Sequence, residues 1–133
     1  MQARERQFDI DLQARWGADP AAPWPVDHAH LRRYTMGDRQ LEREILGLFA
    51  GDLPKSLMAL RAAGSEQDWK MASHTLKGSA RAVGAWRVAR AVAAAEQQPA
   101  AITDPGLKDQ MLRAIDEAVI EVAGYILSLD SPA

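Results

Sequence analysis

The chain has 133 residues, 16 Lys and Arg against 18 Asp and Glu, and no cysteine, which excludes disulfide frameworks, zinc ribbons and cysteine nucleophiles. Its near-neutral charge argues against binding to nucleic acid, which requires a basic surface. It has neither a signal-peptide core nor the roughly 20 consecutive apolar residues that span a bilayer, so we expect a soluble, cytoplasmic protein that contacts no membrane.

The N-terminal region differs in composition from the rest of the chain. Residues 1–25 end in the proline-rich stretch GADPAAPWP, which predicts an arm or linker ahead of a domain that covers residues 26–130. Within this arm, Phe8, Leu12 and Trp16 recur every four residues and could form a short amphipathic helix. The arm is interpreted either as a loose extension or as a docking segment.

An all-α domain is expected because alanine outnumbers valine, isoleucine and threonine together. A short helix is predicted from Asp27 to Gly37. The next begins at the N-cap residue Asp38 and ends at Ala63-Gly64. Its predicted core face consists of apolar residues three and four apart, namely Leu41, Ile45, Leu48, Phe49, Leu53, Leu57 and Leu60.

Three further helices follow. One runs from the cap Ser65 to Val83 and stops at Gly84, and another covers residues 85–98. The last opens at Asp104-Pro105 and carries the regular apolar series Leu107, Met111, Ile115, Ala118, Val122 and Ile126. Four long helices with single apolar stripes and short connections predict an antiparallel up-and-down four-helix bundle, preceded by one short additional helix.

The helix over residues 65–83 carries an unusual polar strip. Its predicted core side contains Ala72, Leu76, Ser79 and Val83, and His74 points the opposite way. Lys77, Gly78 and Arg81 follow His74 at three, four and seven positions, so they share its side of the helix.

These residue types suit phosphoryl transfer. Gly78 costs about 1 kcal/mol relative to alanine inside a helix, which indicates that a partner needs the space beside the imidazole. Lys77 offers a cation for an anion such as a phosphoryl group, and a neutral imidazole is a nucleophile. On spacing alone, an ordinary solvated histidine remains the alternative.

The segment Ser73-His74-Thr75-Leu76-Lys77-Gly78-Ser79-Ala80, with Gly84-Ala85 after it, resembles the signature of histidine-containing phosphotransfer (HPt) domains. The preceding helix also resembles the family in its Gly37-Asp38, Phe49, Asp52 and Pro54. The resemblance covers about residues 26–128. It departs from the family pattern in Ser73, where alanine is frequent, and in smaller apolar residues at Val88, Val92 and Ala95, with Glu96 following at its expected place.

The resemblance implies a phosphocarrier of two-component signalling, a monomer without ATP-binding motif that is not a stand-alone enzyme. His74 would accept a phosphoryl group from an aspartate of a receiver domain, in a response regulator or hybrid histidine kinase, and pass it to another receiver. Lys77 would pair with the phosphoryl oxygens, Gly78 would leave room for the receiver, and Ser79 would hold the helix against its neighbours. The chain would need no cofactor, because the receiver's acidic pocket would hold the Mg²⁺.

Other groups of residues have structural or docking interpretations. Asp27, His28 and His30 do not predict a metal site, because residues two apart on a helix point in different directions. Trp69 and Trp86 are expected in the core or at its rim. The residues predicted to border the docking surface are Lys70, Met71, Arg81 and Arg87. An alternative function is an interaction module that binds receiver or kinase domains without carrying phosphate.

Overall fold

The structure is a computed structural model that describes residues 24–129. The predicted helix with Phe8, Leu12 and Trp16 lies outside these residues. The described part is helical and contains no strand, which confirms the predicted all-α class. Its elements are α2 (His28–Thr35), α3 (Arg39–Ala62), α4 (Glu66–Val83), α5 (Trp86–Glu96), the 3-10 helix η2 (Pro99–Ile102) and α6 (Pro105–Leu129).

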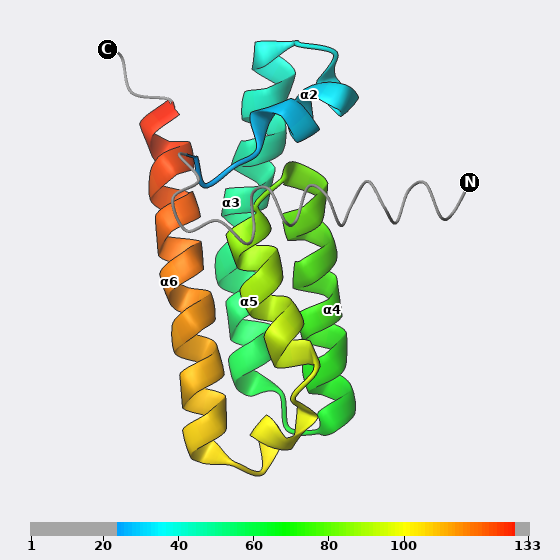
Figure 1. The fold of residues 1–133 in the computed structure, drawn as a ribbon, viewed down its shortest axis with the longest axis vertical. Coiled ribbons are helices and arrows are strands. Elements are labelled where there is room, and N and C mark those ends of the chain that lie inside the picture. Colours follow the sequence, from blue (N-terminus) through cyan, green and yellow to red (C-terminus); the bar gives the residue numbers. More distant parts are fainter. Residues whose placement is uncertain (1–23, 130–133) are drawn as a thin grey trace, which may run out of the picture.

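The four longest helices lie side by side, and each runs opposite in direction to the one before it (Figure 1). Helix α3 contacts α4 and α6, and α5 contacts the same two helices, so the four enclose one core. The short helix α2 crosses the end of the bundle where α3 begins and α4 ends. The connection η2, which the sequence pattern did not predict, leads from α5 to α6 at the opposite end.

The predicted helix starts are confirmed by their caps. The side-chain oxygens of Asp38, Ser65 and Asp104 accept hydrogen bonds from backbone amides three residues later, at 3.1, 3.0 and 3.1 Å. Each bond satisfies an amide that has no partner within its own helix. These local signals explain why the element boundaries agree closely with the sequence pattern.

The core face of α3 differs from the prediction at two leucines and at two residues that were not predicted. Leu48 is 71% exposed and Leu41 is also exposed, whereas Leu46 and Glu42 are buried. The rest of the predicted face is confirmed, because Phe49, Leu53 and Leu60 are buried and Ile45 and Leu57 pack partly against the core. The Glu42 carboxylate is buried beside α2, where Oε1 accepts a hydrogen bond from Thr35 Oγ1 at 3.0 Å.

Of the two serines in α4, Ser73 is buried and Ser79 is exposed, so the prediction of Ser79 on the core side was wrong. The Ser79 hydroxyl donates to the carbonyl of Thr75 one turn earlier, at 3.2 Å, and does not hold the helix against a neighbour. Leu76 and Val83 are buried as predicted. In α6, Ile115, Val122 and Ile126 are buried as predicted.

Both tryptophans of the described bundle core are buried, as expected. Trp69 Nε1 donates to the carbonyl of Ala95 on α5 at 2.7 Å, and Trp86 Nε1 donates to Asp27 Oδ2 at 2.9 Å. The first bond ties α4 to α5 near the lower end of the bundle. The second ties α5 to the start of α2 at the upper end.

The turn between α4 and α5 requires glycine. Gly84 ends α4 with a positive φ of 77°, and an added Cβ would lie only 2.9 Å from the carbonyl oxygen of Asp27. The backbone amide of Asp27 in turn donates to the Gly84 carbonyl at 2.9 Å. Both the backbone angle and the close approach exclude a side chain here. They explain why glycine precedes Ala85 in this turn.

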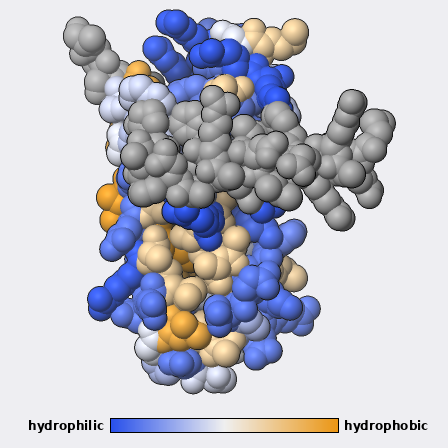
Figure 2. Space-filling model, viewed as in Figure 1, coloured by the Kyte–Doolittle hydropathy of each residue, from blue (hydrophilic) through white to orange (hydrophobic). Residues whose placement is uncertain are grey.

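The surface over α5 is moderately apolar and is flanked by hydrophilic side chains of α4 and α6 (Figure 2). Alanines are responsible, and Ala91 and Ala94 line a shallow groove toward Ala114 and Ala118 on α6. No helix within residues 24–129 is long and apolar enough to cross a membrane.

Candidate functional site

The His74 side chain lies on the outer face of α4 and is 75% exposed. Leu76 and Ser73, its neighbours on the inner face, are buried and fix the rotation of the helix about its axis. The predicted orientation of His74 away from the core is therefore confirmed. An imidazole held on a rigid helix and open to solvent is accessible to another macromolecule.

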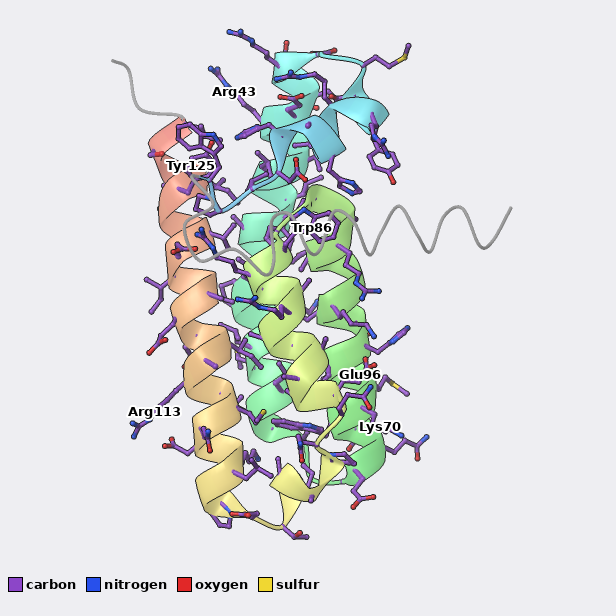
Figure 3. The ribbon with its side chains drawn as sticks, viewed as in Figure 1. Arg43, Lys70, Trp86, Glu96, Arg113 and Tyr125 are labelled. Atoms are coloured by element: carbon purple, nitrogen blue, oxygen red, sulfur yellow. The ribbon has the colours of Figure 1, made fainter. Side chains whose placement is uncertain are left out.

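Glu96 at the end of α5 is the partner of His74. His74 Nδ1 lies 3.3 Å from Glu96 Oε2, and the Glu96 side chain is only 14% exposed. The carboxylate is close because α5 packs antiparallel against α4 (Figure 3).

The same carboxylate binds Lys77. Lys77 Nζ donates to Glu96 Oε1 at 2.8 Å, and the lysine side chain is mostly buried beside it. This hydrogen bond is the largest influence that holds the pKa of the Glu96 carboxyl below its ordinary value, against an opposing effect of desolvation. The charge of Lys77 and the nearby His74 ring lower that pKa further. Glu96 is therefore ionised at neutral pH.

An ionised carboxylate determines the tautomer of His74. A carboxylate can only accept a hydrogen bond, so the Nδ1 atom that faces Glu96 carries the ring proton. In the neutral imidazole, Nε2 is then the unprotonated nitrogen and holds the free lone pair. The pairing with Glu96 thus leaves the lone pair on the ring nitrogen that faces away from the carboxylate.

Gly78 leaves the surface next to His74 open. A Cβ built at this position meets no atom within 4 Å, so the fold does not require glycine here. The helical glycines Gly47 and Gly51 on α3 are equally open. Openness alone therefore does not distinguish Gly78, and its place one turn from His74 is what connects it to the site.

The predicted docking residues divide between two places. Lys70 and Met71 line a shallow depression together with His74 and Glu96. Arg81 lies further along the exposed side of α4. Arg87 lies elsewhere, because its guanidinium donates to Glu121 on α6 at 2.6 Å.

Of the residues weighed as a metal site, the side chains of Asp27 and His28 have structural partners. Asp27 Oδ1 accepts from the backbone amide of His30 at 3.1 Å, and its other oxygen accepts from Trp86. His28 Nε2 is hydrogen-bonded to the Tyr125 hydroxyl. Within residues 24–129, no three His, Asp or Glu side chains are grouped to hold a metal ion.

Glu96 is a residue of this group that the sequence pattern did not predict. Its only signal was the glutamate that follows the apolar positions in the family pattern, which gave no indication of a contact with His74. The contact joins residues 22 positions apart on different helices, so no helical spacing could have revealed it.

The sequence matches the Hpt domain family over residues 44–123, more than half of the chain. No curated protein and no solved structure gives a significant match. The matched region includes α4 and α5 in full, and with them His74, Lys77, Gly78 and Glu96. The chain therefore belongs to the Hpt domain family, whose members take part in histidine phosphotransfer with receiver domains in phosphorelays.

Proposed function

We propose that this chain is a four-helix-bundle phosphocarrier that accepts a phosphoryl group on His74 and relays it between receiver domains. The observation that carries the proposal is the group formed by His74, Lys77 and Glu96, in which a solvent-exposed imidazole is hydrogen-bonded to an ionised carboxylate.

The transfer step follows from the ring's tautomer. The Nε2 lone pair attacks the phosphorus of a receiver's aspartyl phosphate, the N–P bond forms, and the bond from phosphorus to the aspartate oxygen breaks. The leaving group is the aspartate carboxylate, so no proton needs to move. The ring becomes positively charged while Nδ1 keeps its proton, and the Glu96 carboxylate 3.3 Å away stabilises that charge.

Lys77 has a role compatible with its bond to Glu96. An ammonium has three N–H donors, and one of them is used by Glu96. The remaining donors can bind phosphoryl oxygens on Nε2, because Lys77 lies one helical turn from His74. The Mg²⁺ of the reaction would belong to the receiver's acidic pocket, and this chain would carry no cofactor.

The receiver would dock around the exposed side of α4. Lys70 and Met71 border the depression that contains His74, and Arg81 extends the positive charge along the helix. A receiver presents an acidic pocket, so cations around the imidazole favour its approach. We further infer a monomeric, cytoplasmic phosphoprotein whose bundle domain covers residues 26–130.

The decisive experiment is transfer from a receiver domain carrying radiolabelled aspartyl phosphate. The full chain should acquire label that is lost in acid and retained in base, as expected for a phosphorus–nitrogen bond. His74→Gln should acquire none. His28→Gln is the matched control and should be labelled like the wild type, because His28 lies on α2 and is bonded to Tyr125.

The interaction module is the competing outcome. It would be supported if the wild-type chain bound receiver domains but acquired no acid-labile label from any of them. Label that persisted in His74→Gln would contradict the proposed acceptor directly.

A further inference from the structure

A second group of charged and aromatic side chains lies away from His74, at the end of the bundle where α2 crosses α3. A cleft of about 530 Å³ opens there between α2, α3 and the last turns of α6. This volume lies within the range of small-molecule sites. The residues that line the cleft are Trp24, His28, Ala29, Arg32, Arg39, Glu42, Arg43, Leu46, Tyr125 and Leu129.

One wall of the cleft is aromatic. The rings of Trp24 and Tyr125 lie 6.0 Å apart at 43°, and His28 meets Tyr125 edge-on at 5.7 Å. Trp24 is 52% exposed, so about half of its side chain is open to a ligand. Burial raises the pKa of the Tyr125 hydroxyl, so the phenol is neutral and adds no negative charge to the cleft.

The rest of the rim is positively charged. Arg39 and Arg43 are one turn apart on the same side of α3, and Arg32 approaches from α2. The one carboxylate of the lining, Glu42, is buried, bonded to Thr35 and 4.0 Å from Arg32. Within residues 24–129, Arg39 and Arg43 have no carboxylate partner closer than 4.0 Å.

The local charge contrasts with that of the whole chain. Three guanidinium groups and one carboxylate give the lining an excess of positive charge, although the protein carries a net charge of −2. Guanidinium groups bind phosphate oxygens in pairs, and aromatic faces stack on flat rings. Figure 3 shows Arg43 and Tyr125 together at this end, apart from Lys70 and Glu96.

We propose that this cleft binds an organic phosphate that carries a flat ring, such as a nucleotide. The ring would lie against Trp24 and Tyr125, and the phosphates would contact Arg39 and Arg43. This site is independent of the phosphotransfer function, since it shares no residue with the group around His74.

The test is a titration of the ¹⁵N-labelled full chain with ATP, adenosine and inorganic tripolyphosphate, followed by NMR. ATP should shift the Trp24 indole signal, assigned with Trp24→Phe, and the amides near Arg39, Arg43 and Tyr125. Trp69 and Trp86 serve as internal references, because their indole groups are buried and hydrogen-bonded to the protein. Adenosine and tripolyphosphate should each bind more weakly than ATP.

The combined variant Arg39→Ala with Arg43→Ala should weaken ATP binding about tenfold or more, because two charge-assisted donors are lost. The matched control is Arg113→Ala, an exposed arginine near the other end of α6 that pairs with Asp109 at 2.9 Å (Figure 3). It should bind ATP like the wild type. The proposal is overturned if ATP leaves the Trp24 signal unchanged, if the double variant binds equally well, or if tripolyphosphate binds as tightly as ATP.

Discussion

Two polar regions of this molecule use the same kinds of groups in opposite ways. At the junction of α2 with α4 and α5, the Asp27 carboxylate is fully buried and both of its oxygens accept hydrogen bonds from the protein. At the group around His74, the carboxylate of Glu96 also has two partners, but His74 Nε2 and two donors of Lys77 remain available. The first carboxylate joins elements of the fold, and the second orients groups that we propose act on another molecule.

The largest effect should come from Asp27→Ala, which removes the buried acceptor of the junction. The Trp86 indole and the His30 amide would both lose their partner in a site closed to water, so we expect about 3 kcal/mol of destabilisation. Urea unfolding would measure it. Asp104→Ala is the matched control, because Asp104 caps α6 in the same way but is exposed, and its loss should cost about 1 kcal/mol. Equal losses of stability in the two variants would show that the burial of Asp27 does not increase its contribution.

Gly84→Ala should destabilise the chain by about 2 kcal/mol, because it combines a positive φ with a contact of 2.9 Å to the Asp27 carbonyl. Gly47→Ala is its control, with no atom within 4 Å, and should stabilise by about 0.5–1 kcal/mol. Both values come from urea unfolding. The folded fraction of Gly84→Ala should still accept phosphate from a labelled receiver. A folded fraction that accepted none would show that the turn at Gly84 affects the group around His74.

Glu96→Gln should destabilise the chain by about 1–2 kcal/mol at pH 7, because the mostly buried Lys77 ammonium loses its charged partner and keeps only an amide oxygen as acceptor. The pKa of Glu96 is depressed in the folded chain, so its contribution is present above the ordinary carboxyl pKa of 4.5. It is lost as the pH falls through the depressed folded value. The free energies of unfolding of the wild type and the variant, measured between pH 7 and pH 3, should therefore converge at the acid end.

The same variant should accept phosphate more slowly. Without the carboxylate, Nδ1 is no longer held in its protonated form and the charge on the phosphorylated ring is no longer stabilised. Initial rates of transfer from a labelled receiver would show this. A variant that transferred at the wild-type rate would assign Glu96 a purely structural role.

Gly78→Ala should produce the smallest change in stability, an increase of about 0.5–1 kcal/mol, because the added methyl meets no atom of the chain. Phosphoryl transfer should nevertheless fall, since the methyl lies where the receiver approaches His74. Gly51→Ala, equally open but on α3, should gain similar stability and keep its transfer rate. If both variants transferred equally well, Gly78 would have no role in access.

The helices and their ends could be predicted because their signals are local. The N-caps Asp38, Ser65 and Asp104 act on amides three residues away, and Gly84 ends α4 through its own backbone. The inward face of α3 could not be predicted in full. Leu41 and Leu48 follow the same helical spacing as the buried residues but are exposed, and the buried charged residue Glu42 is bonded to Thr35 on α2.

The all-helical class and the strip of His74, Lys77 and Gly78 could be predicted from local patterns, because helical spacing places residues three and four apart on one side. The partner of that strip, in contrast, depends on how the helices pack. Glu96 reaches it because α5 packs against α4, and Arg87 is removed from it because its guanidinium pairs with α6. Likewise, the arginines of α2 and α3 meet Trp24 and Tyr125 only at the end of the packed bundle. Contacts between distant segments depend on how helices pack, and no local pattern encodes them.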